Sequence, residues 1–202
     1  MRIYKTKAIV LDNVSNGFNR NKVVLFTENF GKIILKLTGY GRSPNHWAGV
    51  FDAANILGIS FTKRGNFYVV TGWELVHFSP DRSIGDFAVK ELILEVANEI
   101  IPLSDPDSNL FRWLSWSIKN ISVSTACVFL ARIIYQGGFM DFADSDLRKL
   151  LSANFAAFIK EKLPEEVDGI MKKEVSFIEG FTGKDIKSYS LYQETCKKFP
   201  IV

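Results

Sequence analysis

Apolar and polar positions alternate with a period of two over the first third of the chain. In residues 32–38, Ile33, Leu35 and Leu37 fall on one side, and Lys32 and Lys36 fall on the other. This alternation is typical of a β-strand with one buried face. The same pattern, broken by Gly-containing turns at 28–31 and 63–66, predicts five strands: Ile3–Leu11, Lys22–Thr27, Lys32–Thr38, Ile56–Thr62 and Phe67–Phe78.

Five short strands within about 80 residues favour a small closed barrel. An OB-type barrel and an SH3-like barrel both fit this strand count. A long stretch rich in Gly, Ser, Pro and Asn, Gly39–Asp52, separates the third strand from the fourth. Loops of this length in a small barrel often carry its function.

After Ser79-Pro80 the apolar spacing becomes helical. Ala88, Leu92 and Val96 form one stripe of a first helix, and three carboxylates at 91, 95 and 99 form its opposite face. We expect that acidic face to be solvated or to lie between domains. Further helices are predicted at Asp107–Asn120, Val123–Gln136, Asp146–Leu163, Glu165–Glu179 and Lys184–Lys197. The predicted fold class is therefore α+β, with a barrel domain at 1–80 and an all-α helical bundle at 81–202.

Composition places the chain among ordinary globular proteins. Of its 202 residues 47% are hydrophobic, and only two are cysteines. Unpaired cysteines favour a reducing compartment. No apolar run is long enough for a signal peptide or a membrane span. We therefore expect a cytoplasmic protein without a membrane partner.

Charge is distributed unevenly along the chain. Residues 1–80 carry 10 Lys and Arg against 4 Asp and Glu, a net +6, whereas residues 81–202 carry 15 against 18, a net −3. A basic barrel attached to a mildly acidic bundle favours an anionic partner for the barrel.

Catalytic and metal chemistry find little support in the sequence. His46, His77, Cys127 and Cys196 lie far apart, so we expect no metal site. Ser60 and Lys63 have the spacing of a serine nucleophile motif, but they lie in a predicted strand and turn and lack companion motifs. No Gly-rich phosphate-binding loop is present. The chain is therefore predicted to be a cofactor-free, non-enzymatic protein.

Basic residues interleaved with aromatic residues are the positive signal. Single-stranded nucleic acid binds such surfaces through phosphate contacts and base stacking. Because neighbours on a strand alternate, one of Phe67 and Tyr68 must face the barrel core. The candidate DNA-binding residues are Lys5, Lys7, Lys32, Lys36, Tyr40, Arg42, Trp47, Lys63 and Arg64.

The order and spacing of several segments resemble the bacterial RecO family of DNA repair and recombination mediators. These segments are Lys7–Leu11, Leu25–Thr27, Glu28, Gly31–Lys32, Gly39–Arg42, Thr71–Leu75, Lys90–Leu94 and Gly183–Tyr189. The resemblance favours the OB-type barrel over the SH3-like one. The chain departs from the family at the cysteine pairs that hold zinc in many members, which are missing here. It also has fewer basic residues after Gly39 than the family.

The resemblance implies a recombination mediator. Such a protein binds single- and double-stranded DNA, anneals complementary strands, and works with RecR to load RecA recombinase on strands covered by single-strand binding protein. It implies a bacterial, nucleoid-associated location. It further implies a docking slot for the acidic, aromatic-ended tail of the single-strand binding protein, for which Arg112, Lys119 and Arg132 are the candidates. The alternative is an adaptor whose barrel binds protein and does not bind DNA.

Overall fold

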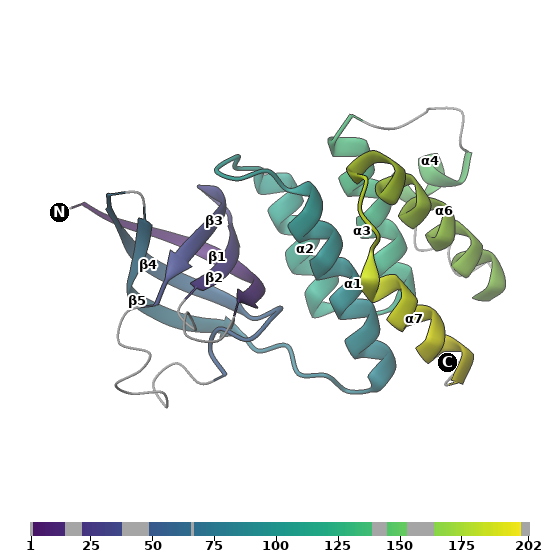
Figure 1. Cartoon of the computed structure of the whole chain (residues 1–202), viewed down its shortest axis with the longest axis horizontal. Helices are drawn as coiled ribbons and strands as arrows, with labels where there is room; N and C mark the ends of the chain where they lie inside the picture. The colour runs from purple at the N-terminus through teal and green to yellow at the C-terminus, as the bar shows by residue number, and fades with distance from the viewer. Residues whose placement is uncertain are drawn as a thin grey trace. The chain divides into compact units, whose positions relative to one another are not determined.

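The computed structural model describes residues 2–14, 22–37, 49–65, 67–138, 145–152 and 164–198 (Figure 1). The chain separates into two compact units. The first unit joins Met1–Pro80 to Ile101–Ser115, and the second joins Asp81–Ile100 to Trp116–Val202.

The strands of the first unit close into a barrel. They are β1 Ile3–Val14, β2 Lys22–Thr27, β3 Gly31–Lys36, β4 Ile56–Arg64 and β5 Phe67–His77. Their order around the barrel is β1-β2-β3-β5-β4, and β4 pairs back to β1. The pair β3–β5 is parallel, and the other described pairs are antiparallel. Closure satisfies the strand edges that an open sheet would leave unpaired.

Inward-facing side chains of alternating positions fill the barrel. Phe61 is fully buried at its centre. Its ring stacks on Tyr4 at 5.6 Å between centroids and meets Phe30 and Tyr68 edge-on at 5.3 Å and 5.4 Å. The remaining apolar core is formed by Ala8, Val10, Val23, Leu25, Ile33, Leu35, Leu37, Phe51, Leu57, Ile59 and Val70. This core explains why the strand alternation is so regular in the sequence.

Helices form the second unit (Figure 1). They are α1 Ile84–Ile100, α3 Val123–Gln136, α4 Ser145–Leu151, α6 Pro164–Thr182 and α7 Lys187–Lys198, while α2 Ser108–Lys119 begins in the first unit and ends in the second. The apolar helix α3 packs against α1, α4 and α6, and α1 also packs against α7. Ser122 caps α3, because its Oγ accepts a hydrogen bond from the Thr125 N–H at 3.2 Å.

The predicted class, α+β with strands before helices, is confirmed. The helix predicted at Asp146–Leu163 corresponds to α4, which ends at Leu151, where the Ser152 N–H and hydroxyl both donate to the Lys149 carbonyl and close a turn. Residues 153–163 of that prediction lie outside the described residues. Residues 101–115 belong to the same compact unit as the barrel, with Ser104 bonded to Lys32 and Phe111 packed on Phe26. The domain limits 1–80 and 81–202 stay a prediction.

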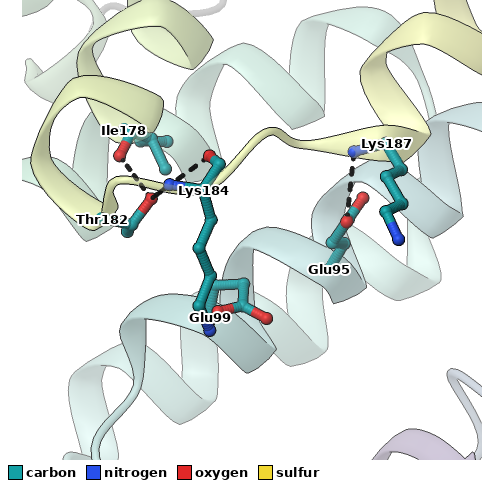
Figure 2. Close-up of polar contacts among 6 residues, drawn as sticks. All are labelled: Glu95, Glu99, Ile178, Thr182, Lys184 and Lys187. Carbon is teal, nitrogen blue, oxygen red and sulfur yellow. Dashed lines mark hydrogen bonds and ion pairs between the residues drawn. The ribbon is translucent and has the colours of Figure 1, made fainter.

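The acidic face of α1 holds the start of α7 in place (Figure 2). The two Glu95 carboxylate oxygens accept hydrogen bonds from the backbone N–H groups of Lys187, at 3.2 Å, and Ser188, at 2.7 Å. One turn further along α1, Glu99 pairs with the ammonium of Lys184. These two carboxylates therefore serve the packing of the second unit, which differs from the expected solvated or interdomain face.

Candidate nucleic-acid interface

The outward-facing side chains of β2 and β3 form three cross-strand rows. The antiparallel register places Lys22 opposite Lys36, Val24 opposite Ile34, and Phe26 opposite Lys32. Residues directly opposite each other have Cβ atoms about 5 Å apart, and like charges in that position repel each other. No described carboxylate forms an ion pair with either Lys22 or Lys36. Among the described residues, the first row is therefore a concentration of positive charge without an ion-pair partner.

The third row, that of Phe26 and Lys32, is covered by residues 101–111, which follow α1 in the chain but belong to the first unit. The Ser104 N–H donates to the Lys32 carbonyl at 2.9 Å, and Leu103 forms an isolated bridge with Lys32. The Phe111 ring lies 5.8 Å from the ring of Phe26, which is fully buried. The covering segment, residues 101–111, thus closes one end of this face, while Lys22, Ile34 and Lys36 stay exposed.

A glycine permits the close approach of the covering segment. Gly31 begins β3 with φ of +68°, in the left-handed region. A Cβ atom at this position would overlap the backbone of Asp105. The approach therefore depends on the hydrogen atom that glycine carries in place of a side chain.

The open face continues from β3 onto β5 and β4. The parallel register sets Lys36 beside Val69, and the Lys36 ammonium lies 6.0 Å from the centroid of the Phe67 ring. Phe67 is 56% exposed and pairs across the next hairpin with Arg64, which is also exposed. We name this surface the basic–aromatic strip, and its members are Lys22, Ile34, Lys36, Phe67 and Arg64. It crosses four consecutive strands, in the order β2, β3, β5, β4.

The predicted DNA-binding residues are distributed over several parts of the barrel. Lys36 and Arg64 lie in the strip, while Lys32 is half-buried beside the covering segment. Lys63 is exposed at the end of β4, but successive residues of a strand face opposite sides. Lys63 therefore lies on the side of the core residue Phe61 and not on the side of Arg64. Tyr40, Arg42 and Trp47 lie outside the described residues.

Lys5 and Lys7 are exposed on β1, away from the strip. They pair with Ser60 and Gly58 on β4. In the barrel order, β2 separates β1 from β3 on one side, and β4 and β5 separate them on the other. Strand pairing therefore does not bring these two lysines next to Lys36.

Sequence reasoning missed three members of the strip, Lys22, Ile34 and Phe67. The signal for Lys22 was present, because the predicted turn at 28–31 sets the register that pairs it with Lys36. For Phe67, the sequence narrowed the choice to two residues but did not decide between them. Alternation required one of Phe67 and Tyr68 to face outward, and the ring of Tyr68, packed against Phe61, shows that it is Phe67.

The predicted peptide-docking residues fall in both units. Arg112, on the part of α2 in the first unit, is exposed and donates to the Asn109 side chain. Lys119 is exposed in the last turn of α2, in the second unit. Arg132 on α3 is half-buried, and its Nη2 donates to the Leu151 carbonyl at the end of α4, at 3.4 Å. Burial lowers the pKa of the Arg132 guanidinium.

Metal ligands are scattered in the part of the chain that the structure describes. There, no three His, Cys, Asp or Glu side chains gather closely enough to hold a metal ion. The absence of zinc stays a prediction. No helix in the described ranges combines the length and apolarity needed to cross a membrane.

No protein-family model matches the chain. Among curated proteins, it is 28% identical to the DNA repair protein RecO of Thermoanaerobacter sp. over 60% of this chain and 50% of the relative. It is 22% identical to that of Syntrophobacter fumaroxidans over 69% of this chain and 59% of the relative. The RecO of Chlorobium limicola is 26% identical over 95% of this chain and 73% of the relative. The match thus spans about half the length of the first of these relatives.

Proposed function

We propose that this chain, which is similar to proteins named DNA repair protein RecO, is a RecO-type, DNA-binding recombination mediator and not an enzyme. Its substrates would be single- and double-stranded DNA, held on the basic–aromatic strip of the barrel. The observation that carries the proposal is the row in which Lys22 stands opposite Lys36. Two like charges in direct opposition destabilise a sheet, so their presence is best explained by an anionic partner.

The proposal extends to the type of barrel and to the partners. The closed order β1-β2-β3-β5-β4 supports an OB-type barrel, whose surface commonly binds oligonucleotides. The relatives' name supports a role in DNA repair. Annealing of complementary strands, cooperation with RecR and loading of recombinase on covered strands are the finer parts of the proposal, together with a cytoplasmic, nucleoid-associated location.

The test is a salt titration of binding to a labelled single strand. For an electrostatic interface, the logarithm of the affinity falls linearly with the logarithm of salt concentration, with a slope of about −0.7 per phosphate contact. Changing Lys22, Lys36 and Arg64 together to Ala should reduce this slope by about 2, the sum for three contacts. Affinity should fall alike for all base sequences, because phosphate contacts do not read bases.

A matched control removes the same charge elsewhere. Arg148, Lys172 and Lys173 are exposed in the helical unit, and their triple Ala variant should keep the wild-type slope. Equal losses from both variants would contradict a site on the barrel. Absence of binding by the wild type at low salt would favour the alternative, an adaptor that binds protein.

A further inference from the structure

Phe67 faces outward from the barrel. Its neighbour Tyr68 packs against the core and meets Phe61 edge-on at 5.4 Å, so alternation turns Phe67 outward. More than half of the Phe67 surface meets solvent. A flat apolar ring is therefore presented on the open face, where no described segment covers it.

Positively charged side chains flank this ring on both sides along the strip. The Lys36 ammonium is 6.0 Å from the ring centroid, and Lys22 lies opposite Lys36 on the next strand. On the other side, Arg64 is the cross-strand partner of Phe67. Strands in a sheet are about 4.8 Å apart, so the strip spans about 14 Å from β2 to β4. That distance accommodates a short stretch of backbone with a base at its centre.

The covering segment limits how a nucleic acid could lie on this surface. It closes the β2–β3 face at Phe26 and Lys32. Among the described residues, the covering segment blocks a path from the lysine row along β3 toward Lys32. A path across the strands, from β3 to β5, leads over the Phe67 ring.

We propose that Phe67 is a stacking platform for an unpaired base and that it makes the barrel prefer single-stranded over double-stranded DNA. This inference rests on the proposed DNA-binding function. Bases in a duplex are already stacked on one another and present their phosphates outward, so they can satisfy Lys22, Lys36 and Arg64 but cannot cover Phe67. Bases of a single strand are free to stack on any aromatic face, irrespective of sequence.

The experiment compares single strands and duplexes of the same sequence at one salt concentration. Phe67→Ala should weaken single-strand binding about 5-fold to 100-fold, which is the range for loss of one base–aromatic stack. Duplex binding should change by less than about 2-fold, since the phosphate-binding residues remain. Phe67→Trp should retain single-strand binding, whereas Phe67→Leu, apolar but not flat, should behave like Phe67→Ala.

Two controls separate base stacking at Phe67 from a general loss of exposed aromatic surface. Phe181 on α6 is 53% exposed, so Phe181→Ala removes a similarly exposed ring from the other unit and should leave both affinities unchanged. A single strand without bases should bind the wild type and Phe67→Ala equally, because no base is left to stack.

Failure of this inference can be distinguished from failure of the proposed function. If the wild type binds neither form of DNA, the proposed function is wrong. If the wild type binds DNA but Phe67→Ala binds single strands normally, or loses single strands and duplexes to the same extent, Phe67 is not a stacking platform.

Discussion

Glu95 on α1 and Ser188 on α7 are joined by a hydrogen bond in which the Glu95 Oε2 accepts from the Ser188 backbone N–H at 2.7 Å. The Ser188 hydroxyl donates to the same oxygen, and the Lys187 N–H donates to the other carboxylate oxygen at 3.2 Å. A helix start carries backbone N–H groups without partners inside the helix, together with a positive partial charge. Here the Glu95 carboxylate, 93 residues away in the chain, accepts hydrogen bonds from the N–H groups at the start of α7 and places a negative charge beside its positive end.

Glu95→Ala should therefore destabilise the helical unit by about 1–2 kcal/mol, the scale of a lost N-cap with charge-assisted hydrogen bonds. Chemical denaturation followed by circular dichroism measures this change. Glu99→Ala is the matched control. It removes an ion pair whose Lys184 partner is mostly exposed, and pairs of that kind contribute about 0–1 kcal/mol. Equal costs for the two variants would show that Glu95 acts only as a surface charge.

Gly31→Ala should destabilise the barrel unit by displacing the covering segment from β3. The added Cβ would overlap the Asp105 backbone, and the residue would also keep an unfavourable positive φ. Gly65→Ala separates these two effects, because Gly65 has φ of +59° with no atom near the added Cβ. Gly65→Ala should cost about 1 kcal/mol from conformation alone, and Gly31→Ala clearly more. Similar unfolding midpoints for the two variants would contradict the tight approach.

Alkaline pH should weaken the helical unit through Tyr189. Burial raises the pKa of Tyr189 to about 12, and the nearby carboxylate of Asp168 adds to the rise. The neutral phenol is thus favoured in the folded state, so its contribution is fully present below pH 10. The contribution is lost as the pH rises from about 10 to about 12, because the unfolded chain then releases the proton first.

The Tyr189 contribution is measured by comparing Tyr189→Phe with the wild type at about pH 9 and about pH 11.5. The variant should lose less stability over this interval, by about 2 kcal/mol. Tyr135→Phe is the control, since Tyr135 is 48% exposed, and it should follow the wild type. If Tyr189→Phe also follows the wild type, the phenol does not govern this part of the pH profile.

Arg132 provides a test of the proposed peptide-docking set. Its guanidinium has several donors, of which Nη2 is directed to the Leu151 carbonyl. Arg132→Ala should lower affinity for an acidic, Phe-terminated peptide by about 1.5–3 kcal/mol, the scale of a hydrogen bond to a charged group. Calorimetry measures the peptide affinity, and binding to bare DNA strands should not change.

Loss of the Leu151 contact could by itself disturb α4, so a second variant is needed. Arg148→Ala removes an exposed positive charge from α4 and should leave peptide binding intact. Peptide binding to Arg132→Ala with wild-type affinity would mean that Arg132 only ties α3 to α4.

Much of the barrel, and two of the five members of its candidate site, Lys36 and Arg64, followed from local sequence pattern. Alternation defined which side of β3 carries Lys36, because the two faces of a strand differ in burial. In a regular antiparallel hairpin, one pair fixes all the others, because each step back along one strand is matched by one step forward along the other. The short turn that sets Thr27 opposite Gly31 therefore also sets Lys22 opposite Lys36. Helix periodicity likewise identified α3 from Val123 to Gln136, since a helix buried on nearly every side must be apolar on nearly every side.

The tertiary structure alone decided which of these residues remain accessible and how the acidic helix face is used. Lys32 and Lys36 lie on the same side of β3, but the covering segment, residues 101–111, packs beside Lys32, whereas Lys36 stays exposed. Glu95 has the spacing of a solvated residue, yet it caps α7. Both outcomes depend on contacts between segments that are distant in the chain. Local periodicity states which side of an element is polar, whereas burial of distant apolar surfaces, such as Phe111 on Phe26, selects what comes to lie against that side.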